Sequence, residues 1–380
     1  MHMRVVMGVH PRWEKAAVAV VTGVLAAGAM CLAEAGSAAA IDHGIVVDCN
    51  KDPNALLLAL SNPQPGSTLQ IKGVCFGNFV IHTDLTLMGV DGAVLDGHNT
   101  GTTVTINGAV RVKLNNLTIT HGANSTTRGG GIINNGGTVT LDNSTVRNNT
   151  ATSTFGGGGG IENNHGTMTL NDSTVRNNSA PGTNGFGGGF DNENGSTVTL
   201  NRSTVSNNFA TVIGGGFENG PHTTLTLLYS TVRNNSSGEV GGIDTSVPTN
   251  LTLDHSTVSK NSSDTDSGGI LITPGTTATL YRSQVLDNIA GTDGAGIFNR
   301  GKITLKESTV SRNIAGRNGG GIYNDSPGNL SLNRSTVEDN TAFNTGGGIY
   351  NLGTATLNDS KVRHNHPNNC AAIPIPGCNG

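Results

Sequence analysis

Four acidic residues occupy one position of a repeating sequence pattern, in four consecutive repeats. Glu162, Asp191, Glu218 and Asp244 each directly follow an isoleucine or phenylalanine that ends a glycine run. If the repeats stack about 4.8 Å apart, these carboxyl groups repel one another, which raises some of their pKa values or attracts a cation. Carboxylate oxygens are ligands of Ca²⁺, so the four residues are candidate calcium ligands, although nothing in the pattern requires a cofactor.

The acidic spacing also fits a second chemistry. It lies near the range of roughly 5–10 Å that separates the paired carboxyl groups of glycosidases. The four residues are therefore a candidate site for polysaccharide cleavage, but the sequence assigns no individual catalytic residue.

Aromatic residues fill the same position in three later repeats. Flat ring faces can line a sugar-binding surface, so Phe298, Tyr323 and Tyr350 are candidate glycan-binding residues. We call the whole position the column, with an acidic segment from Glu162 to Asp244 and an aromatic segment from Phe298 to Tyr350. The alternative is that acidic residues keep an exposed strand row soluble and that tyrosine is simply a good strand former.

The column belongs to a tandem repeat that runs from Gly129 to Asn365. Each unit has a glycine run, an isoleucine or phenylalanine, usually an asparagine, then a Thr-x-Thr-Leu segment and a Ser-Thr-Val-x-x-Asn segment. The serines of successive units are 25 to 30 residues apart, with a mean of 27. A period of this size indicates a stacked array.

Short strands must position the column. In Thr138-Val-Thr-Leu141 the apolar side chains point one way and the threonines the other, and this alternation recurs in every unit. No unit has the helical pattern of about 10–12 residues that a helical repeat needs. Each unit therefore holds two or three short strands, which bury a face only by pairing with the copies above and below. We predict an all-β, single-stranded parallel β-helix of about ten to twelve coils.

Two columns of asparagine support this prediction. Asparagine tolerates left-handed backbone, and stacked copies can bond to one another as ladders. One column is Asn149, Asn178, Asn208, Asn235, Asn261, Asn288, Asn313, Asn340 and Asn365. The other is Asn134, Asn163, Asn192, Asn219, Asn299, Asn324 and Asn351, interrupted by Thr245 and Ile272.

The first 40 residues have the pattern of a secretory signal peptide. Basic residues precede an apolar run from Ala16 to about Ala33, and small residues precede a cleavage point after Ala40. The alternative is a retained membrane anchor, because the run is near the lower length limit for spanning a bilayer. We predict a secreted or cell-surface protein with no stable membrane insertion after cleavage.

The amino-acid composition narrows the classes of molecule that we expect the protein to bind. The net charge of −4 and the absence of a basic cluster give no support for nucleic-acid binding. The expected partner is a polysaccharide or cell-surface glycan, and we expect a monomer.

Four cysteines outside the leader lie near the two ends of the array. Four cysteines allow three pairings, and their separation by the whole array favours Cys49–Cys75 and Cys370–Cys378. Both bridges would staple the ends, where a solenoid needs caps. The alternative is a metal site that recruits His364 and His366, but export favours disulfides.

We divide the chain into four parts. They are a signal peptide (1–40), an N-terminal cap with irregular first coils (41–113), the regular repeats (114–365) and a C-terminal cap (366–380). In the N-terminal cap, residues 52–60 predict a short helix with Asp52 as its N-cap, lying over the open end of the solenoid.

The Gly-Gly-Gly-Ile/Phe and Val-x-x-Asn signals resemble the repeats of chlamydial polymorphic outer-membrane proteins. The segments Val90–Asn99 and Leu117–Gly122 also resemble secreted bacterial proteins with a pectin-lyase-like β-helix. The resemblance covers about residues 45–365 and implies a right-handed parallel β-helix. The sequence departs from the outer-membrane family where a third glycine usually replaces alanine and valine replaces phenylalanine. We also expect no C-terminal membrane barrel.

The functional prediction favours binding over catalysis. No Gly-x-Ser-x-Gly elbow, His-Glu-x-x-His or Walker loop is present, and the repeats lack long inserted loops of the kind that build enzyme sites. We expect an exported, non-catalytic protein that binds a surface or glycan, in an adhesin-like manner, or serves a structural role. The alternative is a polysaccharide lyase or glycoside hydrolase that uses the acidic segment.

Overall fold

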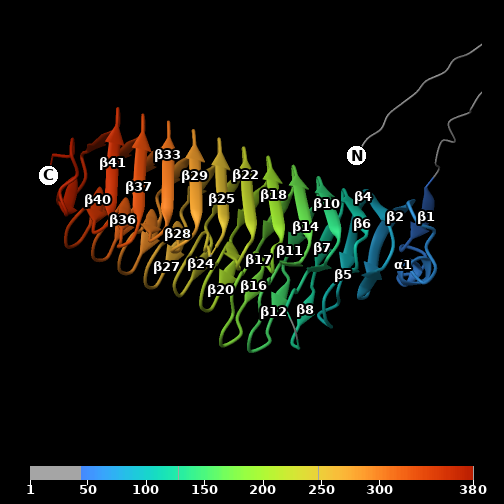
Figure 1. Cartoon of the computed structure of the whole chain (residues 1–380). Coiled ribbons are helices and arrows are strands. Elements are labelled where there is room, and N and C mark those ends of the chain that lie inside the picture. The colour runs from blue at the N-terminus through green and yellow to red at the C-terminus, as the bar shows by residue number, and fades with distance from the viewer. Residues whose placement is uncertain (1–43, 127, 247, 380) are drawn as a thin grey trace, which may run out of the picture. The chain divides into compact units, whose positions relative to one another are not determined.

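The computed structural model describes residues 44–126, 128–246 and 248–379. The expected signal peptide at residues 1–40 therefore lies outside the described residues. The described chain is a parallel β-solenoid of about 12 turns, which confirms the expected all-β parallel β-helix. Figure 1 shows the coils stacked in chain order, from β1 at one end to β41 near the other.

The largest sheet contains two strand columns that pair from coil to coil in parallel register. Its longer strands include the Thr-x-Thr-Leu segments of the repeats. These are β1 (Ile45–Asp48), β2 (Ser67–Phe76), β4 (Leu85–Asp96), β6 (Arg111–Asn115), β10 (Thr138–Asp142), β14 (Thr167–Asn171), β18 (Thr197–Asn201), β22 (Thr224–Leu228), β25 (Asn250–Asp254), β29 (Thr277–Tyr281), β33 (Lys302–Lys306), β37 (Asn329–Asn333) and β41 (Thr354–Asn358).

The shorter strands of the same sheet include the Ser-Thr-Val segments. These are β7 (Thr118–Thr120), β11 (Thr145–Arg147), β15 (Thr174–Arg176), β19 (Thr204–Ser206), β23 (Thr231–Arg233), β26 (Thr257–Ser259), β30 (Gln284–Leu286), β34 (Thr309–Ser311), β38 (Thr336–Glu338) and β42 (Lys361–Arg363).

A second face is built from two-residue strands, and all but the first of them directly follow the first asparagine column. These are β8 (Ala123–Asn124), β12 (Thr150–Ala151), β16 (Ser179–Ala180), β20 (Phe209–Ala210), β24 (Ser236–Ser237), β27 (Ser262–Ser263), β31 (Ile289–Ala290), β35 (Ile314–Ala315) and β39 (Thr341–Ala342). A complete coil such as β13 to β16 thus has four strands. The expectation of two or three was too low, because the residues after each asparagine also pair between coils.

The column lies on a third face, which is split into two sheets. The first contains β3 (Phe79–Ile81), β5 (Val104–Asn107), β9 (Ile132–Asn135), β13 (Ile161–Asn164), β17 (Phe190–Glu193) and β21 (Phe217–Asn219). The second contains β28 (Ile270–Ile272), β32 (Ile297–Asn299), β36 (Ile322–Asn324), β40 (Ile349–Asn351) and β43 (Cys370–Ala372). Between them, Ile243 makes only isolated bridges to Phe217 and Ile270.

The interior combines an apolar core with polar ladders. One core cluster extends from Val47 to Ile375. In the first asparagine column, every amide Nδ2 from Asn149 to Asn340 donates to Oδ1 of the next asparagine, at 2.9–3.1 Å. The second column is bonded in the same way in its two runs, for example Asn163 to Asn192 at 3.0 Å and Asn324 to Asn351 at 2.7 Å. The predicted asparagine ladders are therefore confirmed.

A serine ladder was missed. The serines that mark the repeat are buried except for the last, and each backbone N–H from Ser144 to Ser335 donates to the hydroxyl of the next serine at 3.0–3.1 Å. The repeat pattern used serine only to mark the period, whereas its small side chain satisfies a backbone donor inside the coil.

Both ends are closed as the cysteine spacing predicted. Disulfides join Cys49 to Cys75 and Cys370 to Cys378. The N-terminal helix α1 is shorter than expected (Ala55–Ala59), and its buried Leu56 joins the core. Asn54, not Asp52, is its N-cap residue; Asp52 instead accepts the Asn54 amide hydrogen bond at 2.9 Å. No helix among the described residues is long and apolar enough to cross a membrane.

Candidate functional site

The acidic segment points away from the core, yet it is buried. Residues preceding its members, such as Ile161 and Phe190, face inward and are fully buried, so strand alternation sends Glu162 and Asp191 to the opposite side. Asp191 is nevertheless 0 % exposed and Glu162 8 % exposed. An exposed, solubilising row is therefore wrong for this segment.

The loops that precede the glycine runs cover the acidic segment. A Cβ added to Gly157 would lie 2.1 Å from Oδ2 of Asp191, so the glycine backbone packs directly against that carboxyl group. The ring of Phe186, from the next loop, lies 2.6 Å from the same added atom. Glycine is thus required here for close approach between a loop and a charged group.

Arg128 is the cation of the site. Its Nη1 lies 3.2 Å from Oδ2 of Asp191 and 2.7 Å from Oε1 of Glu193. Its guanidinium carbon also lies 4.5 Å from the centre of the Phe186 ring. Sequence reasoning missed both Arg128, which precedes Asp191 by 63 residues, and Glu193. The i, i+2 spacing of Asp191 and Glu193 on one strand could have identified Glu193, because such residues share a face.

Burial dominates the electrostatics of the acidic segment. It raises the pKa of Glu162 to about 8, with a further contribution from the Asp191 carboxylate. It also raises the pKa of Glu218 to about 8, helped by Asp244, and that of Asp244 to about 7. Burial and the neighbouring Glu218 hold the pKa of Asp191 well above its usual range, although Arg128 opposes this. At neutral pH the segment therefore carries fewer negative charges than its sequence suggests.

Three carboxyl oxygens in this segment lack a hydrogen-bond partner among the described residues. They are Oδ1 of Asp191, Oε2 of Glu218 and Oδ1 of Asp244. The carboxyl groups of Asp191 and Glu218 are close enough to hydrogen-bond when one of them is protonated. A buried polar atom without a partner costs about 1–3 kcal/mol, so one shared proton, or a cation, stabilises the pair.

A calcium site would have a different composition from the expected one. Asp191, Glu193 and Glu218 each offer a ligand atom, and these atoms lie within 4.8 Å of one another. Glu162 and Asp244 lie outside this group. Arg128 already neutralises two of the three carboxylates, so Ca²⁺ would have to compete with its guanidinium group.

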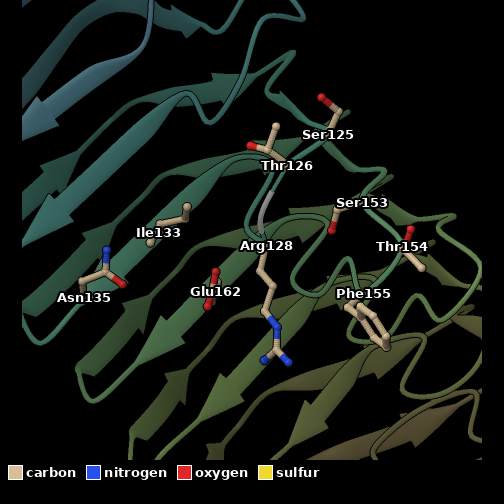
Figure 2. A pocket seen from close by; sticks show the side chains of 9 residues that line it. All are labelled: Ser125, Thr126, Arg128, Ile133, Asn135, Ser153, Thr154, Phe155 and Glu162. Atoms are coloured by element: carbon tan, nitrogen blue, oxygen red, sulfur yellow. The ribbon is translucent and has the colours of Figure 1, made fainter.

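A pocket of about 740 Å³ opens beside Arg128. We call it the Arg128 pocket. It is lined by Ser125, Thr126, Arg128, Ile133, Asn135, Ser153, Thr154, Phe155 and Glu162. In Figure 2 the Arg128 side chain extends between Glu162 on one side and Phe155 on the other. Glu162 is the one member of the acidic segment that lines this pocket.

The aromatic segment has a different character. Phe298 is 3 % exposed, and its ring stacks on Tyr323, with centroids 4.7 Å apart. Tyr323 in turn stacks on Tyr350 at 5.1 Å. The guanidinium carbon of Arg300 lies 4.7 Å from the centroid of the Phe298 ring. Neighbouring rings therefore occupy the faces that a sugar would need on Phe298 and Tyr323, and a glycan role for this segment stays a prediction.

A smaller pocket of about 350 Å³ lies where the aromatic segment begins. It is lined by Glu239, Val240, Thr265, Asp266, Leu271, Phe298 and Arg300. Its arginine is also paired, because Nε of Arg300 lies 2.9 Å from Oδ2 of Asp325.

Comparisons with known proteins leave the function open. No protein-family model matches the chain, and no curated protein matches it. Solved structures that match include an alginate lyase from Paenibacillus sp. strain FPU-7, with 14% identity, a TM-score of 0.38, and coverage of 86% of this chain and 99% of that one. A family 28 exopolygalacturonase from Yersinia enterocolitica matches with 11% identity, a TM-score of 0.41, and coverage of 85% and 79%.

The pectate lyase Pel9A matches with 12% identity, a TM-score of 0.35, and coverage of 83% of this chain and 76% of that one. Similarities this weak say nothing about the chemistry of this chain. The likeness of the repeats to chlamydial polymorphic outer-membrane proteins, and the right-handedness that it implies, stay predictions from the sequence motifs.

Proposed function

We propose that this protein is an exported, non-catalytic β-helix that binds a polysaccharide in the Arg128 pocket. The observation that carries the proposal is the lining of that pocket, which combines an exposed aromatic ring with hydroxyl, amide, guanidinium and carboxyl groups. Its volume of about 740 Å³ falls in the range of small-molecule sites.

Phe155 gives the pocket an apolar surface for a sugar ring. Its side chain is 64 % exposed, and unlike Phe298 it has no stacked aromatic neighbour among the described residues. Ser125, Thr126 and Asn135 add hydrogen-bond donors and acceptors to the pocket lining. A sugar presents an apolar ring face and a rim of hydroxyl groups, and this lining matches both.

The arrangement of carboxyl groups favours binding over cleavage. Glycosidases place two carboxyl groups on either side of a bound sugar. Here only Glu162 reaches the pocket, whereas Asp191 is fully buried and held by Arg128. A sugar in the Arg128 pocket would meet a single carboxyl group.

Polysaccharide cleavage is the second candidate, and one observation favours it. Burial raises the pKa of Glu162 to about 8, which leaves it protonated at neutral pH, as a general acid must be. Its partner would be Asp191, one coil away, after movement of the covering loop.

Export is part of the proposal. The two disulfides at the ends of the solenoid are typical of proteins from oxidising compartments. The leader predicted at residues 1–40 agrees with this, and so does a partner found outside the cell. We propose no required cofactor.

The test is retention and turnover of a panel of plant, bacterial and host polysaccharides by the purified protein. We expect at least one polysaccharide to retain the protein without release of new chain ends, with Ca²⁺ or with chelator. Phe155→Ala should abolish retention. Phe343→Ala is the matched control, because Phe343 is likewise exposed (76 %) but does not line the pocket.

Two results would change the assignment. New chain ends that disappear in Glu162→Ala would establish the cleavage candidate. If no polysaccharide is retained or cleaved, a purely structural solenoid is the remaining reading.

A further inference from the structure

The Glu162 carboxyl group lies in the wall of the Arg128 pocket. It is 8 % exposed, and it lines the pocket together with Arg128 and Phe155. A nearly buried polar group that faces a pocket is well placed to bond to a ligand.

The charged groups that face Glu162 influence whether its carboxyl group is protonated. They are Asp191 and Glu193 from the next strand and Arg128 from the covering loop. Arg128 already makes ion pairs with both of these carboxylates, so its positive charge is compensated. Two acidic groups and one paired cation leave no surplus positive charge for a third carboxylate.

We propose that the Arg128 pocket takes a neutral glycan and rejects uronic-acid glycans, with Glu162 donating a carboxylic acid O–H to a sugar oxygen. This inference rests on the proposed function, and it names the class of ligand. Ser125, Thr126 and Asn135 complete the polar contacts, and Phe155 covers the apolar face of one sugar ring.

A uronic-acid chain would bring its own carboxylate next to Asp191 and Glu193. Like charges placed together across an interface weaken binding strongly. The guanidinium group of Arg128 could accept such a carboxylate only by releasing the two carboxylates that it holds, one of which is fully buried. The smaller pocket on the same face adds Glu239 and Asp266, so a longer anionic chain would be repelled there too.

Binding should therefore depend on pH. A neutral glycan that needs the protonated form of Glu162 binds equally well at all pH values well below the pKa of that group. Since burial raises this pKa to about 8, affinity should be about tenfold lower at pH 9 than at pH 7. Deprotonation removes the donor and places a charge against the sugar.

The experiment is calorimetric titration of the full protein with matched six-sugar oligomers at constant ionic strength. The neutral probes are cello-hexaose and the N-acetylglucosamine hexamer, the anionic probe is hexagalacturonate, and the cationic probe is the glucosamine hexamer. We expect a neutral probe to bind most tightly at pH 7 and to lose about tenfold in affinity at pH 9.

Glu162→Gln is the decisive variant. Its amide keeps a hydrogen-bond donor at the same place but does not titrate, so we expect binding at pH 7 to survive and the loss at pH 9 to disappear. Glu338→Gln is the matched control and should keep the pH dependence of the parent protein, because this half-buried glutamate of the large sheet pairs with Arg363 and lies outside the pocket. Glu162→Ala should lose binding at both pH values, with thermal unfolding confirming that it folds.

The outcomes separate this inference from the function on which it rests. Tighter binding of hexagalacturonate or of the glucosamine hexamer, or an affinity for neutral sugars that does not fall at pH 9, would overturn the inference and leave polysaccharide binding intact. If Glu162→Gln kept the pH dependence, another group would be responsible and the inference would also fail. If no oligomer bound at any pH, the proposed function itself would fail.

Discussion

The acidic and aromatic segments of the column occupy the same position in successive coils, but their side chains interact differently with those of the neighbouring coils. In the aromatic segment each ring packs on the next. The ring centroids are 4.7 Å apart for Phe298 and Tyr323 and 5.1 Å apart for Tyr323 and Tyr350. In the acidic segment each carboxyl group repels the next. Oxygens of Asp191, Glu218 and Asp244 have no hydrogen-bond partner within the part of the chain that the structure describes. Stacking identical positions stabilises one kind of side chain and destabilises the other.

This difference in side-chain contacts separates a segment that contributes to stability from a segment that is a candidate functional site. A stack of aromatic rings that cover one another contributes to stability and leaves few ring faces free to contact a ligand. A row of buried acids is retained at a cost to stability, and such costs concentrate at functional sites. The Arg128 pocket opens beside the acidic segment, at Glu162.

The largest effect should come from cutting the aromatic stack. Phe298→Ala should lower the free energy of unfolding by about 3 kcal/mol, because it empties a buried ring site. Denaturant unfolding at pH 5 and pH 8 should show the same loss at both pH values. Retained glycan binding would place the ligand elsewhere; loss of binding in the folded variant would move the site to the aromatic segment.

The next largest effect should be an increase, not a decrease, in the free energy of unfolding. Glu218 has its pKa raised by burial to about 8 from about 4.5 in the unfolded chain, so its contribution to stability is complete below pH 4.5 and is lost as the pH rises through about 8. Glu218→Gln cannot ionise, and at pH 8 it should be more stable than the parent protein by about 2 kcal/mol.

The pH dependence of the gain is the check on this prediction. At pH 4 both proteins are neutral at this position, and denaturant unfolding should show no gain. A gain of equal size at pH 4 would mean that packing, not charge, explains the effect.

Removing Arg128 should cost less, because its side chain is one-third exposed. Arg128→Ala should lower the free energy of unfolding by about 1–2 kcal/mol at pH 8, since Asp191 and Glu193 lose their shared cation. The loss should shrink as the pH falls, because burial holds the pKa of Asp191 well above its usual range and its protonation removes the charge that Arg128 compensates. Arg312→Ala, which removes an exposed pair with Asp287, is the matched control and should change stability by under about 1 kcal/mol.

Calcium should have the smallest effect on the parent protein. Millimolar Ca²⁺ should raise its free energy of unfolding by less than about 1 kcal/mol, because Arg128 already holds Asp191 and Glu193. In Arg128→Ala the three carboxylates are open to the ion, and the stabilisation should increase. Thermal unfolding with Ca²⁺ and with chelator measures both; a large effect on the parent protein alone would restore calcium as a component of the site.

The sequence was sufficient to predict the strands and ladders of each coil, but not the loops that cover the acidic segment. Alternation in Thr138-Val-Thr-Leu141 predicts the strands, and the regular spacing of asparagines such as Asn149 predicts the ladders, because every coil repeats the same contacts. The cysteine spacing likewise predicts both disulfides. These features follow from interactions between identical positions one period apart.

The burial of Asp191 could not be predicted in this way. It depends on loops before the glycine runs, which differ in length and composition between repeats, and on Arg128, which lies two coils away. The stacking of Phe298 on Tyr323, in contrast, follows from the period itself, since rings one coil apart must lie close enough to cover each other.

The most direct test of the central claim is the structure of the protein with a bound oligosaccharide. We expect sugar density in the Arg128 pocket, with a ring face against Phe155 and a sugar oxygen within hydrogen-bond distance of Glu162. Density along Tyr323 and Tyr350, or on another face, with an empty Arg128 pocket, would contradict the account.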